Sequence, residues 1–236
     1  FVYLGLMVFG AIFGIILGGF IGLILSFIPK RDITKVKEKK SETAGIYSYT
    51  RSTFFITFII IFFYSIDIIM AKIFFSDTLA GSYAVASILS KIIFWGTLPI
   101  SKVMFPLSAG EQKKQTAENI FTNALVILLI GIACVLAVFY FFPGLVVKIF
   151  SGKHIYEAIS VLFYLGIGTS LISLTNLILL YKLSVGKVTG YKYLFIFILI
   201  EIVLLSYFSS NLFEFSIAFI VASAAFLWGS IILLKE

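Results

Sequence analysis

Four ionisable side chains lie in stretches of the sequence that are otherwise apolar enough to cross a membrane: Asp67, Lys72, Lys91 and Glu201. An ionised group at the centre of a bilayer costs about 2.5–3.5 kcal/mol on insertion scales, so it usually has a partner or faces a water-filled cavity. A buried carboxylate can take up a proton or a cation, and a lysine can bind an anionic group. These residues therefore predict binding of ions or of a charged substrate inside a membrane.

Asp67 and Lys91 lie on either side of a turn, Ser76-Asp77-Thr78, whose short oxygen-bearing side chains are typical of a helix start. In a helical hairpin their depths differ by roughly 6 Å, which a lysine side chain can cover. The sequence therefore predicts an ion pair between them. It leaves two interpretations open. The pair fixes the hairpin, or it lines a cavity in which Asp67 takes a proton or cation and Lys91 meets an anionic substrate.

Glu201 lies near the middle of a later apolar stretch, and within its own helix no basic residue follows Lys192. Such a carboxyl group is either neutral, because apolar surroundings disfavour its charge, or it faces a cavity or a lysine of another helix. We assign Glu201, together with Asp67, to ion coupling by H⁺ or Na⁺.

The sequence shows no arrangement that is typical of an enzyme. It has one cysteine, Cys134, and one histidine, His154, so a Cys/His pair, a metal cluster and a Ser/His/Asp triad are not indicated. The glycine-lysine signature of a P-loop does not occur either. We therefore expect no enzymatic activity, no catalytic residue, no metal site and no cofactor beyond a coupling ion.

Hydrophobic residues make up 61% of the sequence and charged residues 12%, far from the usage of soluble proteins. Most apolar stretches exceed the ~20 residues that a helix needs to cross a bilayer. We therefore expect an all-α, polytopic transmembrane helix bundle of about seven spans. The expected spans are 1–28, 46–75, 79–106, 118–142, 156–181, 191–208 and 213–234.

The net charge of +7 does not indicate nucleic acid, because lysine and arginine lie mostly in short connections, as the positive-inside rule requires. The longest polar stretch, 29–45, is rich in lysine, and we expect it to be a cytoplasmic linker. The C-terminus is then cytoplasmic too. The protein is expected to be a multi-pass protein of the cell (cytoplasmic) membrane, in contact with the lipid bilayer.

One side of the expected span 79–106 carries small and polar residues within a narrow arc, while the opposite side is apolar. The residues of this arc are Ala80, Ala84, Ser87, Lys91 and Lys102. A polar stripe on a membrane helix faces protein or water rather than lipid, so we expect this side to face the interior of the protein or a cavity.

Several short motifs occur in an order that can be compared with known membrane protein families. They are Asp67, Ala80-Gly81-Ser82-Tyr83, Lys91 and Phe105-Pro106 in the hairpin, and then Phe142-Pro143, Lys148-Ile149-Phe150, Gly152 and Gly186-Lys187. This order resembles the C-terminal half of polysaccharide-type lipid flippases, in the multidrug/oligosaccharidyl-lipid/polysaccharide exporter superfamily. The likeness runs from about Tyr47 to the end, while 1–28 and the linker are similar to the end of the N-terminal half.

The resemblance implies a fold of about twelve to fourteen helices in two lobes around a central cavity. Residues 1–28 would be the last helix of the N-terminal lobe, with the rest of that lobe upstream, and 46–236 the six-helix C-terminal lobe. It implies transfer of a polyprenyl-pyrophosphate-linked oligosaccharide between leaflets by alternating access, for surface polysaccharide biosynthesis. Polysaccharide assembly proteins are further candidate partners. The expected substrate-binding residues are Arg51, Lys72, Lys91 and Asn176.

Other functions fit parts of the same pattern. A cation-coupled multidrug exporter of the same superfamily would share the fold and differ in its substrate. A membrane-embedded glycosyltransferase or polymerase would need a long outer loop with catalytic groups, whereas the connection around 142–155 is short and apolar. A receptor-like protein of seven helices fits the helix count alone.

Overall fold

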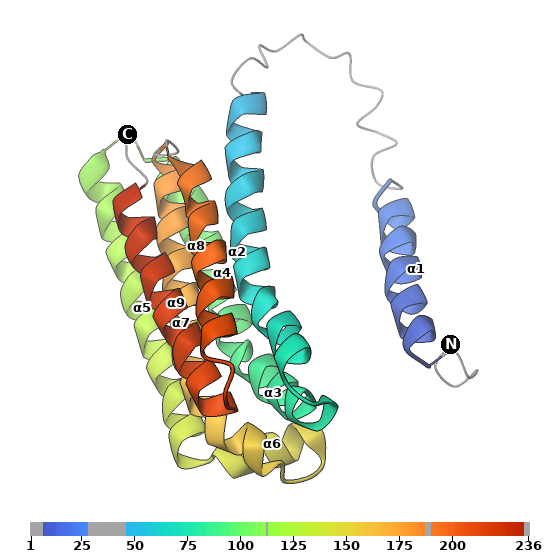
Figure 1. Ribbon diagram of the computed structural model, residues 1–236. Helices are drawn as coiled ribbons and strands as arrows, with labels where there is room; N and C mark the ends of the chain where they lie inside the picture. The colour runs from blue at the N-terminus through green and yellow to red at the C-terminus, as the bar shows by residue number, and fades with distance from the viewer. Residues whose placement is uncertain (1–6, 28–45, 112, 187–189, 234–236) are drawn as a thin grey trace. The chain divides into compact units, whose positions relative to one another are not determined.

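The computed structural model describes residues 7–27, 46–111, 113–186 and 190–233, which form helices and no strand (Figure 1). The chain divides into two units, Phe1–Gly45 and Ile46–Glu236. The described part of the first unit is a single apolar helix, α1 (Met7–Phe27). The expected linker, 29–45, lies outside the described residues.

Within the described residues, six helical segments are long and apolar enough to cross a membrane. They are Phe9–Ser26, Tyr49–Phe74, Asp77–Ala109, Lys114–Phe141, Tyr156–Ser184 and Leu212–Ile232. Large apolar side chains are exposed on the outside of these helices, and a soluble monomer rarely shows so much apolar surface. The chain is therefore a polytopic helical protein of the multi-pass membrane type.

The structure has six such segments where the sequence predicted seven, because the expected span 191–208 is shorter than a membrane-crossing helix. It consists of a 3₁₀ helix (Tyr191–Leu194) and α8 (Phe195–Tyr207), which has 13 residues. At 1.5 Å per residue, α8 covers about 20 Å of the ~30 Å hydrocarbon core. α8 packs against α2 (Ile46–Phe74) and α9 (Leu212–Leu233).

The second unit is organised around α7 (Tyr156–Ser184), which is the most buried of the candidate spans. α7 contacts α2 and α9, and also four further helices. These are α3 (Asp77–Ser90), α4 (Ile92–Ala109), α5 (Lys114–Phe141) and α6 (Pro143–Ser151). Small residues on α7 allow this close approach, since a Cβ added at Gly168 would lie 2.5 Å from Cδ1 of Phe219 on α9.

Three buried hydroxyls of α7 are satisfied within the helix. Ser170, Ser173 and Thr175 donate hydrogen bonds to backbone carbonyls one turn earlier, at 2.7 to 3.1 Å. Because a bilayer interior offers no water, a hydroxyl there must find a partner inside the protein. α7 can therefore carry polar side chains although it lies in the middle of the second unit.

The expected span 79–106 is interrupted at Lys91, which separates α3 from α4. The carbonyl of Ser87 accepts the Lys91 backbone N–H at 3.1 Å and also the Ser90 hydroxyl at 2.8 Å. α4 then contains Pro99 and Pro106, neither of which can donate to the preceding turn. The segment is thus a bent pair of helices with a lysine at the bend.

The small and polar stripe faces the protein interior along α3. Ala80, Ser87 and Lys91 are buried, and α3 packs against α2 and α7. Lys102, in α4, is exposed and departs from the stripe. The expectation that the stripe faces the interior of the protein is therefore confirmed for α3.

The short helix α6 lies at the same end of the bundle as the turn between α2 and α3 (Figure 1). It begins at Pro143, where a missing N–H costs nothing in the first turn, and it ends at Gly152, whose φ of 73° favours glycine. The short segment expected between the spans 118–142 and 156–181 is therefore a helix.

The contact between α7 and α9 yields a test of packing. Replacing Gly168 by alanine forces the new methyl group against the buried ring of Phe219, and such overpacking costs about 1–3 kcal/mol. Gly131→Ala on α5, where a Cβ meets nothing within 4 Å, should instead gain up to ~1 kcal/mol of helix propensity. Thermal unfolding in detergent should therefore shift down for Gly168→Ala and not for Gly131→Ala. Equal shifts would contradict the packing.

Candidate functional site

The predicted ion pair is present in the interior of the second unit. Nζ of Lys91 lies 2.9 Å from Oδ1 of Asp67, and the Asp67 side chain is fully buried while that of Lys91 is 7% exposed. Asp67 comes from α2, and Lys91 from the junction of α3 and α4. The charge pair thus joins α2 to the bend.

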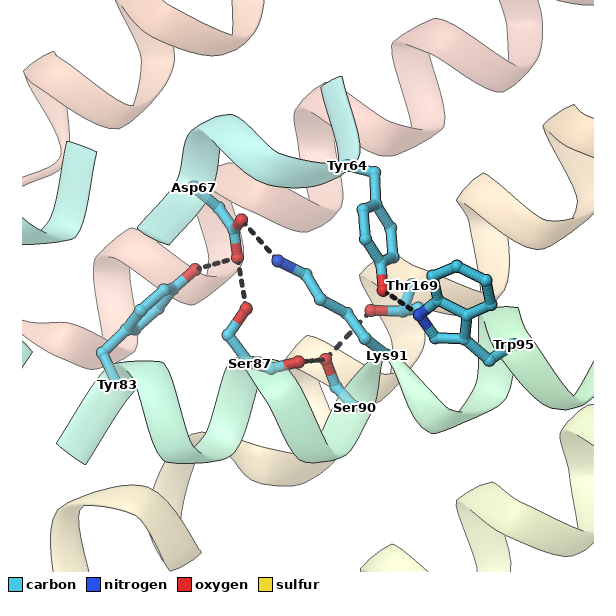
Figure 2. Close-up of polar contacts among 8 residues, drawn as sticks. All are labelled: Tyr64, Asp67, Tyr83, Ser87, Ser90, Lys91, Trp95 and Thr169. Atoms are coloured by element: carbon cyan, nitrogen blue, oxygen red, sulfur yellow. Dashed lines mark hydrogen bonds and ion pairs between the residues drawn. The ribbon is translucent and has the colours of Figure 1, made fainter. Parts of the chain in front are cut away.

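Two hydroxyls of α3 complete the surroundings of the Asp67 carboxylate. Ser87 donates to Oδ2 at 2.6 Å and Tyr83 donates to the same oxygen at 3.3 Å. Tyr83, Ser87 and Lys91 follow one another at intervals of four residues, which places them on one face of a helix (Figure 2). Sequence reasoning put Ser87 and Lys91 on this face and missed Tyr83, although the same spacing identifies it.

An aromatic pair lies on the other side of the lysine. The Lys91 ammonium lies 4.7 Å from the ring centroid of Tyr64, and the Tyr64 hydroxyl accepts a hydrogen bond from Nε1 of Trp95 at 2.7 Å (Figure 2). A cation over an aromatic face gains roughly 0.5–2 kcal/mol, more when it is desolvated. Asp67 and Tyr64, both from α2, therefore hold the ammonium from two sides.

A pocket of about 370 Å³ opens beside this aromatic pair. Its lining residues are Tyr64, Ile88, Lys91, Ile92, Trp95 and Gly96. Gly96 leaves it open, since a Cβ at this position would meet nothing within 4 Å. The pocket therefore connects the surface of the bundle with the residues that hold Lys91.

The bend itself is tied to α7. The Ser90 hydroxyl, which precedes Lys91, lies 3.0 Å from the hydroxyl of Thr169, and both side chains are buried. The central helix therefore contacts the bend through a direct polar interaction.

Glu201 of α8 is fully buried, and neither of its carboxyl oxygens has a hydrogen-bond partner among the residues that the structure describes. It lies close enough to Asp67 and Lys91 to interact electrostatically with both, and Tyr83 is within the same reach. The two carboxyl groups assigned to ion coupling therefore belong to one buried cluster, which they form with Lys91 and Tyr83. We refer to these four residues as the charge cluster.

The expected substrate-binding residues do not all gather here. Arg51 is exposed in the second turn of α2, and the numbering puts it about 24 Å from Asp67 along that helix. Lys72 is exposed in the last turn of α2 and pairs with Asp77 across the turn, so it does not lie inside the hairpin. Asn176 is buried on α7, about 10 Å along the helix from Thr169. Of these four residues, only Lys91 belongs to the charge cluster.

Comparison with known proteins gave no match: no family model, no curated protein and no solved structure aligns with this chain. What stands is a helical protein with six candidate membrane spans and a buried charge cluster. Among the described residues, no group of three or more His, Cys, Asp or Glu could hold a metal ion. The arrangement can hold a proton, move an ammonium between carboxylates, or bind a charged group that replaces one of them.

The energetics of the pair can be tested by neutralising it. Lys91→Met leaves the buried Asp67 carboxylate without its cation, and breaking a buried pair in this way costs about 3–5 kcal/mol. The double variant Asp67→Asn/Lys91→Met removes both charges, so its free energy of unfolding should return close to that of the wild type. The measurement is denaturant unfolding in detergent micelles.

Lys102→Met is the matched control, because Lys102 is an exposed lysine of the same bent helix pair. It should change the free energy of unfolding by less than about 0.5 kcal/mol. If Lys91→Met is no less stable than the double variant, the pair does not stabilise the fold.

Proposed function

We propose that this chain is the C-terminal lobe of a membrane transporter that moves a polyprenyl-pyrophosphate-linked oligosaccharide across the cytoplasmic membrane by alternating access. The observation that supports this proposal is the charge cluster at a helix bend, beside a pocket that opens on the bundle surface. Transporters place such groups where membrane helices are interrupted, because substrates and coupling ions bind there.

A purely structural role explains the cluster less well. Replacing a buried ion pair by well-packed apolar residues is often neutral or even stabilising, so stability alone does not call for charges at this place. Three ionisable groups that interact inside an apolar bundle are costly, and Glu201 has no described hydrogen-bond partner. Function is the better reason for their presence.

Lys91 is the residue through which the substrate would act. Its ammonium can exchange the Asp67 carboxylate for a phosphate oxygen of the substrate, since both are anionic oxygen acceptors. The pocket lined by Tyr64, Trp95 and Gly96 gives the route by which such a group approaches. Asp67 and Glu201 then serve as the ion-coupling groups.

One observation favours a second candidate function. The charge cluster contains two carboxyl groups and one ammonium, and an excess of carboxylates suits a cationic substrate. A cation-coupled multidrug exporter would use Asp67 and Glu201 for binding and Lys91 for orientation. The two functions differ in the substrate that is transported, so a direct assay separates them.

Filling the pocket tests the proposed route. Gly96→Leu projects a side chain into the pocket, and because nothing lies within 4 Å of the new Cβ, the fold should tolerate it. We expect transfer of a fluorescent polyprenyl-pyrophosphate-linked oligosaccharide in proteoliposomes to slow by about tenfold or more, equivalent to at least 1.4 kcal/mol in the barrier. The assay uses the full-length protein.

Gly81→Leu is the matched control, because Gly81 is an exposed helical glycine in open space that does not line the pocket. It should leave the rate of transfer within about twofold of the wild type. If both variants transport normally, the pocket is not the route. If the wild type transports cationic dyes and no lipid-linked oligosaccharide, the exporter is the correct assignment.

Orientation follows from the charge of the connections and can be measured by labelling. Ser76 and Ala109 are exposed at the two ends of the bent segment Asp77–Ala109. With Cys134 replaced by alanine, a cysteine at Ser76 should react with an impermeant thiol reagent added to intact cells. A cysteine at Ala109 should react only after the membrane is permeabilised. Labelling of both from outside would contradict the topology.

A further inference from the structure

Glu201 presents a physical problem that the ion pair does not solve. A buried ionised carboxylate without a partner is among the most costly groups in a protein, and one that cannot be paired becomes neutral instead. Both oxygens of Glu201 are buried, and neither accepts a hydrogen bond from any residue that the structure describes. In this arrangement Glu201 must carry a proton.

A bound metal cation does not fit the position of Glu201. Cations such as Ca²⁺ and Mg²⁺ are surrounded by about six or more oxygen ligands at 2.0–2.6 Å, and an ion between such ligands holds their oxygens close together. Neither Glu201 oxygen has a hydrogen-bond partner among the described residues, and those residues form no group of three or more His, Cys, Asp or Glu that could hold a metal. A proton needs no such set of ligands.

The ionisable groups around Glu201 come from few elements. α2 brings Asp67, while α3 and its junction with α4 bring Tyr83 and Lys91. α9 packs on α8, but its one described ionisable residue is Glu214, which bonds Asn211 in the first turn. The 3₁₀ helix, which holds Tyr191, Lys192 and Tyr193, precedes α8 at its start. Among the described residues, Lys91 is therefore the cation that interacts electrostatically with Glu201.

We infer that Glu201 is the proton-binding site of the charge cluster, and that Lys91 moves from Asp67 to Glu201 when this proton leaves. This inference rests on the proposed transport function, for which it selects H⁺ as the coupling ion. With Glu201 protonated, the Asp67–Lys91 pair makes the cluster neutral. Release of the proton to water leaves two carboxylates competing for one ammonium, and the cluster then has a net charge of −1.

The position of Lys91 gives this exchange a mechanical consequence. Lys91 lies at the junction of α3 and α4, so a change of partner from α2 to α8 acts directly on the bend. The neighbouring Ser90 hydroxyl lies 3.0 Å from the hydroxyl of Thr169, so the bend also contacts the central helix α7. Protonation would thereby be coupled to the shape of the bent helix pair.

The protonation state can be observed directly, without a transport assay. Infrared difference spectra of the full-length protein in lipid vesicles should show, at neutral pH, the C=O stretch of a protonated carboxyl group. The band should vanish in Glu201→Gln and remain in Glu214→Gln, the control on the neighbouring helix. Absence of the band, or its persistence in Glu201→Gln, would overturn the assignment.

The proposed move of Lys91 from Asp67 to Glu201 is tested by removing the Asp67 carboxylate. In Asp67→Asn, Lys91 retains Glu201 as its carboxyl partner, so the protonated band should be lost at a lower pH than in the wild type. In Asp67→Asn/Lys91→Met the cation is gone, and the band should persist to a higher pH than in Asp67→Asn. If the two variants titrate alike, Lys91 does not pair with Glu201.

These spectra separate the inference from the proposed function. A Glu201 band with the expected shifts, in a protein that transports no lipid-linked oligosaccharide, would support the proton site and reject the substrate. Transport without a Glu201 band would reject the proton site and leave the proposed function standing.

Discussion

The structure depends on one constraint: inside a bilayer, a polar group must find its partner within the protein. Three buried hydroxyls of α7 meet this constraint by bonding to the backbone of their own helix, which allows a polar helix to form the centre of the bundle. Asp67 meets it with one ammonium and two hydroxyls from a single helical face. Glu201 alone of the charge cluster has no such bond to a described residue, and this singles it out chemically.

The sequence predicted the parts of the fold that follow from hydrophobicity and local spacing. Long apolar stretches identified the membrane-crossing helices, and the depths of Asp67 and Lys91 in a hairpin were enough to predict their ion pair. The stripe that contains Ser87 also identified the buried side of α3. These predictions succeed because helical periodicity fixes which residues share a face, whatever the rest of the bundle does.

The remaining differences arise from tertiary structure. Hydropathy does not distinguish an α-helix from a 3₁₀ helix, so it did not predict the 3₁₀ helix that precedes α8. The remaining α-helix is too short to count as a membrane span. At the junction before α4, the carbonyl of Ser87 accepts the Ser90 hydroxyl as well as the Lys91 N–H, and no sequence pattern specifies this arrangement. Lys72 looked like a membrane charge because apolar residues surround it in sequence, yet its position in the last turn lets it pair with Asp77.

The charge cluster joins α2 to the junction of α3 and α4, beside the central helix α7. α7 contacts five helices and the short α6, and small residues such as Gly168 allow close packing there. The junction of α3 and α4 differs from these apolar contacts, because Lys91, which lies there, is paired with the buried Asp67 of α2. The spacing of Tyr83, Ser87 and Lys91 directs one helical face at a single carboxylate. In the proposed transport function, any group that competes for Lys91 would therefore act at this junction.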